Sequence, residues 1–111
     1  MTHELFLHDE PFQKIKYGTK RIEMRLNDEK RRLIRVGDSI RFTNRTTNET
    51  LTVEVTKLVP YKSFKELYAK NDKKLLGYKE EEIADSSYME QFYPKEKELE
   101  NGVLAIHIKL I

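Results

Sequence analysis

The sequence predicts an α+β domain built around a small β-barrel of about five to six strands, with a short helix after the first strand and a helical insertion before the last. Apolar and polar residues alternate in several short segments, which is the period of a half-buried strand. Gly, Asn and Asp residues typical of turns separate these segments. Strands do not alternate regularly with helices, so a doubly wound α/β fold is excluded.

The length of 111 residues fits one domain spanning residues 1–111, because two cores of normal size need a longer chain. Hydrophobic residues make up 38% of the chain and charged residues 36%, as in a globular protein with a highly charged surface. There is no cysteine, which excludes disulfides and thiolate metal sites and fits a reducing compartment. No signal-peptide pattern and no apolar run of about 20 residues is present. We therefore expect a cytoplasmic protein and no membrane-spanning segment.

The first part of the chain predicts a strand, a short helix and a second strand. Residues 4–7 form a short apolar run, and Asp9 then stands where a helix N-cap is expected. Gly18 is suited to the left-handed conformation that follows a helix. The strand over residues 20–26 comes next. Residues 27–35 are polar and basic and indicate a loop or a single helical turn.

The middle of the chain predicts a β-hairpin. Residues 36–38, Val-Gly-Asp, form a turn that leads into a strand over residues 39–43. Residues 44–49 are the tip of the hairpin. Residues 50–58 alternate again, and Pro60 is expected to end this strand because proline lacks a backbone donor.

The last part of the chain predicts two helices and a buried strand. Ser63 is a favourable N-cap, and Glu66 three residues later completes a capping box. A second helix is expected over residues 80–93, ended by Pro94. The chain then turns into a strand over residues 103–110 that is apolar on both faces.

The charges are unevenly distributed along the sequence. Residues 13–45 contain eleven Lys or Arg and four Asp or Glu, whereas residues 80–100 contain two Lys and eight acidic residues. The basic part indicates a surface for a polyanion, of which nucleic acid is the commonest. Alternatively, these cations only solubilise strands and loops. The acidic helical segment 80–100 is expected to be a solvated face, or a lid that covers a cleft and competes with nucleic acid.

The strand over residues 20–26 carries the most informative pattern. Three apolar residues alternate with three charged ones, so that the apolar set faces a core and the charged set shares the other face. A glutamate between two arginines on one face is either a polar binding site or a solvated ladder of ion pairs. The apolar set is Ile22, Met24 and Leu26, and the charged set is Arg21, Glu23 and Arg25.

Four segments in order resemble the ASCH (activating signal cointegrator homology) domain family. They are Gly18-x-Lys20-x-x-Glu23-x-Arg25, then Val36-Gly37-Asp38 with its strand, then Tyr61-Lys62-Ser63-Phe64-Lys65-Glu66-Leu67, and finally Gly102-Val103-Leu104-Ala105-Ile106. The resemblance covers nearly the whole chain. It implies a PUA-like β-barrel beside a cleft lined by Lys20, Glu23 and Arg25, in a superfamily that largely binds or modifies RNA.

The resemblance implies RNA or a nucleotide-like ligand as the partner. We expect no cofactor and no metal. A hydrolase of the same fold, acting on an acylated cytidine or on RNA, is the alternative, with Lys20 and Glu23 as the catalytic pair. The family's amidohydrolase subgroup carries a threonine, its proposed nucleophile, where this chain has Glu23, so that reaction is in doubt here. A protein-interaction module whose acidic and basic halves bind partners is a third class.

The residues themselves suggest roles in such a cleft. Lys20 and Arg25 would bind a phosphate or polarise a carbonyl, and Glu23, ionised by the neighbouring cations, would accept hydrogen bonds from a base. Other cations are expected along the path of a nucleic-acid backbone, and two tyrosines could stack a base. The three histidines have no metal-ligand spacing. The additional candidates are Arg21, Arg41, Arg45, Tyr17 and Tyr61 for RNA, with Arg31, Arg32 and Arg35 in the same basic patch.

Overall fold

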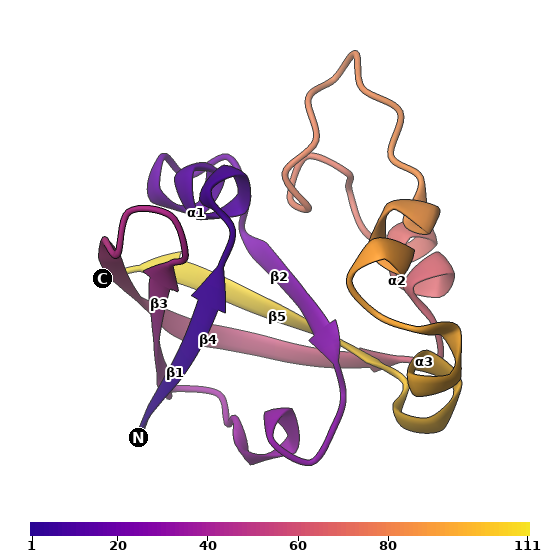
Figure 1. Ribbon diagram of the computed structural model, residues 1–111, viewed down its shortest axis with the longest axis horizontal. Coiled ribbons are helices and arrows are strands. Elements are labelled where there is room, and N and C mark those ends of the chain that lie inside the picture. Colours follow the sequence, from indigo (N-terminus) through magenta and orange to yellow (C-terminus); the bar gives the residue numbers. More distant parts are fainter.

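The computed structural model describes residues 1–111 and contains one five-stranded sheet with the strand order β1-β3-β4-β5-β2 (Figure 1). β1 and β3 are parallel, and the other neighbouring strands are antiparallel. The sheet therefore has β1 and β2 as its two edges. The strands are β1 Thr2–Leu7, β2 Ile22–Leu26, β3 Ser39–Asn44, β4 Thr50–Tyr61 and β5 Val103–Leu110.

Short helices occupy the connections. α1 follows β1, and α2 and α3 lie together beyond β2 with the chain that joins them (Figure 1). A single turn of 3-10 helix, η1, falls in the loop after β2, and a second, η2, falls between α2 and α3. No helix of the protein has the length and apolar character needed to cross a membrane. The helices are α1 Asp9–Lys16, η1 Arg31–Leu33, α2 Phe64–Lys70, η2 Ser86–Gln91 and α3 Lys95–Asn101.

β5 is buried on both faces because two apolar clusters use its alternate residues. Leu104, Ile106 and Ile108 belong to a cluster with β1, β3, β4 and α1, which fills the inside of the curled sheet. Val103 and Ala105 point the other way, into a cluster with β2 and α2. The expectation of a strand buried on both faces is confirmed, and it explains why the segment is apolar throughout.

β2 is also buried on both faces, although it alternates in character. Ile22, Met24 and Leu26 pack on the α2 side of the sheet. Glu23 and Arg25 pair with Ile106 and Leu104 of β5, so their side chains lie on the inner side of the curled sheet. Two of the three charged residues of the predicted face, Glu23 and Arg25, are therefore turned inward, whereas Arg21 precedes the strand and is exposed.

Two boundaries differ from the sequence prediction at the ends of elements. β4 continues through Pro60 to Tyr61. β3 pairs only with residues 50–54 of β4, so the second half of β4 has no neighbouring strand on that side. At such a free edge the missing backbone donor of a proline is tolerated. The N-cap of α1 is His8, and Asp9 is the first helical residue. Asp9 instead accepts a hydrogen bond from Asn44 at 2.8 Å, which ties α1 to the end of β3.

The helix expected over residues 80–93 is absent. This part of the chain forms turns and the short η2, which Asp85 caps by accepting from the Ser87 amide. Three consecutive glutamates and the Asp-Ser-Ser sequence favour turns and caps over a continuous helix. The regular helix of the acidic region is α3, which begins after Pro94. The five strands, the helix after β1 and the helical insertion before β5 agree with the predicted α+β barrel fold.

Candidate functional site

A cavity of about 500 Å³ opens at the seam where the two edge strands of the sheet, β1 and β2, approach each other. Strand β1, strand β2 and the segment from α2 to η2 each contribute one wall. The volume lies within the range of about 300–1,000 Å³ typical of small-ligand sites. The lining includes Phe6, His8, Lys14, Lys20, Glu23, Arg25, Arg31, Arg45, Tyr68, Tyr78, Glu82, Tyr88, Met89, Phe92 and Tyr93.

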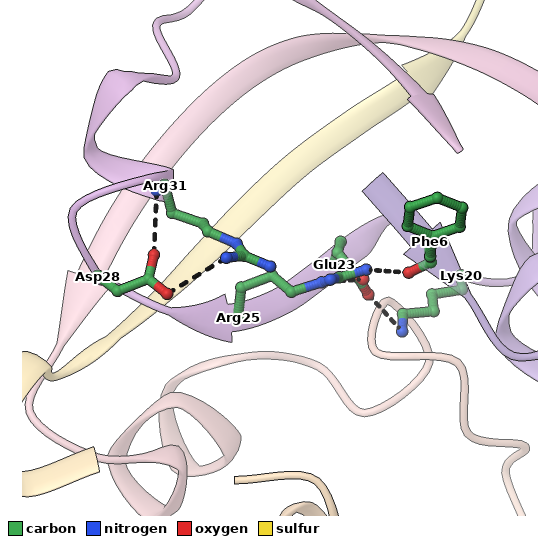
Figure 2. Close-up of polar contacts among 6 residues, drawn as sticks. All are labelled: Phe6, Lys20, Glu23, Arg25, Asp28 and Arg31. Carbon is green, nitrogen blue, oxygen red and sulfur yellow. Dashed lines mark hydrogen bonds and ion pairs between the residues drawn. The ribbon is translucent and has the colours of Figure 1, made fainter. Parts of the chain in front are cut away.

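Glu23 lies between two cations in this cavity (Figure 2). Lys20 Nζ donates to Glu23 Oε1 at 2.9 Å, and Arg25 Nε donates to Glu23 Oε2 at 2.7 Å. All three residues are at least nine-tenths buried. We call this trio the polar clamp. It contains two cations and one carboxylate, so one positive charge of the buried group stays uncompensated.

The clamp keeps Glu23 ionised. Burial raises the pKa of Glu23, but the nearby charges and hydrogen bonds of Lys20 and Arg25 outweigh burial and lower this pKa to about 2. Burial in turn lowers the pKa of Arg25, and the charge of Glu23 outweighs that effect and raises it. At neutral pH Glu23 is therefore a hydrogen-bond acceptor and a weak proton acceptor.

The turn after α1 places Lys20 at the cavity. Gly18 ends α1 with a φ of +79°, the left-handed conformation that the sequence predicts there. The Lys20 amide donates to the Lys14 carbonyl, and Lys20 forms an isolated bridge with Leu76. Lys20 is thus held between the end of α1 and the chain that follows α2.

Arg25 also joins the two edges of the sheet. One of its terminal nitrogens donates to the carbonyl oxygen of Phe6 in β1 at 2.7 Å (Figure 2). No backbone ladder links β1 and β2. The side chain of Arg25 therefore bridges the seam, and the clamp contributes both to closure of the barrel and to the cavity wall.

Aromatic side chains form the wall opposite the clamp. The hydroxyl groups of Tyr68 and Tyr78 are hydrogen-bonded at 2.8 Å, and burial raises the pKa of both. Phe92 lies 5.6 Å from His8, measured between ring centroids, so η2 reaches across the mouth to the start of α1. The ring of Tyr88 meets Phe92 edge-on at 5.5 Å. The wall therefore offers both ring faces and hydroxyl groups.

Two arginines at the cavity retain free donors. Arg31 pairs with Asp28 at 3.2 Å, and its Nε is a buried nitrogen without a hydrogen-bond partner (Figure 2). The guanidinium of Arg45 lies 5.3 Å from the centre of the Phe6 ring. Arg45 takes part in no ion pair of the protein, all of which join other residues.

The structure brings together some of the predicted site residues and separates others. Lys20, Glu23, Arg25 and Arg45 line the cavity. The other four lie elsewhere. Arg21 is exposed beside a separate hollow of about 300 Å³, Arg41 forms an exposed ion pair with Glu4 at 2.9 Å, Tyr17 is exposed after α1, and Tyr61 accepts a hydrogen bond from Asn71 and packs in the β2–α2 cluster.

The aromatic wall is the part of the site that the sequence analysis did not identify. Four of the six tyrosines fall within residues 68–93, and this crowding was the available signal. The acidic residues of this region predicted a solvated helix instead. No three His, Asp or Glu side chains gather as metal ligands would, and His3 pairs with Asp38 at 2.7 Å.

The chain matches the model of the ASCH domain over residues 5–111. It is 36% identical to the hypothetical protein PH0355, whose crystal structure superposes with a TM-score of 0.85 and full coverage of both chains. It is also 36% identical to the protein PF0455 from Pyrococcus furiosus, with a TM-score of 0.77 over 100% of this chain and 98% of that one. No protein of curated function matches the sequence.

More distant structures share the fold. An ASCH protein from Zymomonas mobilis is 14% identical and superposes with a TM-score of 0.70, covering 97% of this chain and 66% of that one. An ASCH domain from Lactobacillus crispatus is 20% identical, with a TM-score of 0.57 over 97% and 79% of the two chains. At these identities the likeness concerns the PUA-like architecture alone.

Proposed function

The chain belongs to the ASCH domain family, and from this premise we propose that it binds single-stranded RNA, with the base of one nucleotide in the cavity between β1 and β2. The observation that carries the proposal is the polar clamp, a buried carboxylate with a donor on either side, facing an aromatic wall. Single-stranded RNA is recognised mainly through splayed-out bases that stack on aromatic rings and form hydrogen bonds along their edges.

The clamp matches the edge of a base in chemistry. A base edge presents amino donors beside carbonyl or ring-nitrogen acceptors. Glu23 can accept from an amino group, because each carboxylate oxygen has a second lone pair beyond the one that its cation uses. Lys20 and Arg25 have further N–H groups for the acceptors. The Tyr68–Tyr78 pair and Tyr88 supply the aromatic surface.

The charges at the cavity support an anionic ligand. The clamp retains one positive charge, and Arg31 and Arg45 add two cations with free donors. Arginine binds phosphate through two parallel hydrogen bonds more readily than lysine does. A nucleotide in the cavity would therefore have its phosphate near these arginines.

Hydrolysis is the alternative that the clamp favours less. A pKa of about 2 makes Glu23 a weak general base at neutral pH, where an effective base has a pKa near the working pH. Glu23 also stands where the amidohydrolase subgroup carries its threonine. Turnover of acylated cytidines or of RNA, lost in Lys20→Ala and Glu23→Gln, would restore this alternative.

Binding can be tested by fluorescence anisotropy with a labelled single-stranded RNA of mixed sequence at low salt. We expect Arg31→Gln to weaken binding about tenfold, the effect of losing about 1.4 kcal/mol. Arg32→Gln is the matched control, because it removes the same charge from the same turn but Arg32 does not line the cavity. The proposal is wrong if the RNA does not bind at low salt, or if the two variants weaken binding equally.

A further inference from the structure

Phe6 and Arg45 form an exposed pair at the edge of the cavity, beyond the polar clamp that would hold the base of the nucleotide in the cavity. Phe6 is 53% exposed, although it is a large apolar residue in a regular strand. Its neighbours Leu5 and Leu7 point into the core, so the Phe6 ring stands on the outer face of β1. The guanidinium of Arg45 lies 5.3 Å from the centre of this ring.

We propose that the Phe6–Arg45 pair is a second subsite, which stacks the base of the nucleotide next to the one in the cavity and binds the phosphate between them. This inference rests on the proposed function, because it assigns the chain length of the RNA that the same site takes. It distinguishes a site for at least two linked nucleotides from a site for a free nucleoside.

The Phe6–Arg45 pair is continuous with the cavity. Phe6 and Arg45 both line the cavity wall. The carbonyl oxygen of Phe6 accepts from Arg25 of the clamp at 2.7 Å (Figure 2), while its ring is exposed. A single residue thus joins the clamp to the outer face of β1. A strand of RNA leaving the cavity on this side passes directly over the ring.

Arg45 carries a charge that no carboxylate of the protein compensates. Every other arginine at the cavity has a carboxylate partner, Glu23 for Arg25 and Asp28 for Arg31. Arg45 has none, and its side chain makes no hydrogen bond within the protein. The N–H donors of Arg45 are free to bind a phosphate. The Phe6 ring lies against the face of the guanidinium, so the donors along the edge of the guanidinium stay exposed.

The backbone around Arg45 is held by hydrogen bonds on both sides. The backbone of Arg45 extends the β1–β3 ladder, since its amide donates to the Leu7 carbonyl at 2.9 Å. The turn that follows is held by Asn44, which is fully buried and accepts from the amides of Thr46 and Thr47. The arginine is therefore presented from a fixed position, which limits the loss of conformational entropy on binding.

The test compares nucleotides of increasing length by isothermal titration calorimetry. Mixtures of the four nucleoside 5′-monophosphates and of mixed-sequence dinucleotides serve as probes. In the unmodified protein we expect the dinucleotides to bind more tightly than the monophosphates. In Phe6→Leu, which keeps an apolar side chain but removes the ring, we expect dinucleotide binding to weaken about five- to tenfold, consistent with loss of one base stack. Monophosphate binding should change by less than about twofold, because the clamp is intact.

Arg45→Gln provides a second, independent variant. It should reduce the slope of log affinity against log salt for a labelled single-stranded RNA by about 0.7, the value for one phosphate of a single strand. Arg32→Gln, which removes the same charge from a residue outside the cavity, should leave the slope unchanged. Thermal unfolding of each variant shows whether it is folded.

The outcomes separate the two proposals. If monophosphates and dinucleotides bind with equal affinity, or if Phe6→Leu weakens both equally, the second subsite is wrong while the cavity remains a nucleotide site. If no nucleotide of any length binds, the proposed function fails and the subsite with it.

Discussion

Glu23 illustrates how one buried residue sets the chemistry of the cavity. A carboxylate taken out of water is costly unless cations and hydrogen bonds compensate it. Lys20 and Arg25 provide both at 2.9 and 2.7 Å, and Arg25 simultaneously bridges the edge strands through Phe6. The same contacts that stabilise the carboxylate therefore hold the donors in position for a ligand.

Replacing Glu23 with glutamine should destabilise the fold. Glu23→Gln leaves two buried cations without their carboxylate, and breaking a buried ion pair in this way costs about 3–5 kcal/mol. The free energy of unfolding, measured with urea, reports the loss. Glu4→Gln removes a carboxylate from the exposed pair with Arg41 and should cost no more than about 1 kcal/mol. Equal losses for the two variants would contradict a buried, tightly coupled clamp.

The stability of the protein should fall in acid through Glu23. Its pKa is about 2 in the folded protein and 4.5 in the unfolded chain, so the folded form binds the proton less well. The stabilisation is present above about pH 4.5 and is lost as the pH falls toward 2, with a total of about 3 kcal/mol for a shift of this size.

This decrease can be assigned to Glu23 by comparison with the variant. Urea unfolding at several pH values between 7 and 2 gives the free energy for both proteins. Several other carboxylates also have lowered pKa values, among them Asp9 and Asp38, and they contribute equally in both proteins. The difference between wild type and Glu23→Gln should shrink as the pH falls. A constant difference would show that Glu23 titrates normally.

Among the elements, α2 shows how side chains fix the N-terminus of a short helix. The Ser63 side chain accepts from the Glu66 amide at 3.1 Å, and the carboxylate of Glu66 accepts from the Lys62 amide at 3.2 Å. The buried Glu98 of α3 accepts from the Phe64 amide at 2.8 Å. The Ser63 half of the predicted capping box is present, whereas Glu66 accepts from the amide before the N-cap instead of from the Ser63 amide. A carboxylate 34 residues away accepts from a further amide of this turn.

Ser63→Ala should destabilise the protein by about 1 kcal/mol, the usual cost of losing an N-cap side chain. Since α2 carries Tyr68 of the cavity wall, ligand affinity should fall with it. Ser86→Ala is the control, because the Ser86 side chain makes no hydrogen bond within the protein. Thermal unfolding of both variants gives the comparison, and an unchanged midpoint for Ser63→Ala would mean that Glu98 alone suffices.

Local sequence patterns predicted most of the elements. The site depends instead on contacts between segments that are distant in the sequence. The alternation in residues 22–26 is a property of a strand and was recognisable in the sequence. Burial of Glu23 depends on β1 and on the chain near Leu76, which approach it only in the folded protein. The wall formed by Tyr78, Tyr88 and Phe92 was missed because turns, without a period, place these rings together.

At the scale of the whole molecule, the cavity lies between oppositely charged parts of the chain. Residues 13–45 provide Lys20, Arg25, Arg31 and Arg45, whereas the acidic region 80–100 provides Glu82 on the opposite wall. Residues of the acidic region therefore line one side of the cavity. An RNA phosphate would meet attraction from one wall and repulsion from the other.

Glu82→Gln should tighten RNA binding, because it removes a like charge from the cavity wall. The amide keeps an oxygen that can accept from the Lys79 amide, as the carboxylate does at 2.7 Å, so the local structure is retained. A solvent-screened interaction of about 0.5–1 kcal/mol corresponds to a gain of about two- to fivefold at low salt. The gain should decrease at high salt, where such interactions are screened.

Glu81→Gln is the matched control, since Glu81 is exposed in the same segment and does not line the cavity. Anisotropy titrations of a labelled single-stranded RNA at two salt concentrations give the two affinities needed for each protein. An equal gain in both variants would indicate a general effect of net charge. No gain for Glu82→Gln would place the phosphates away from this wall, on the side of Arg31 and Arg45 alone.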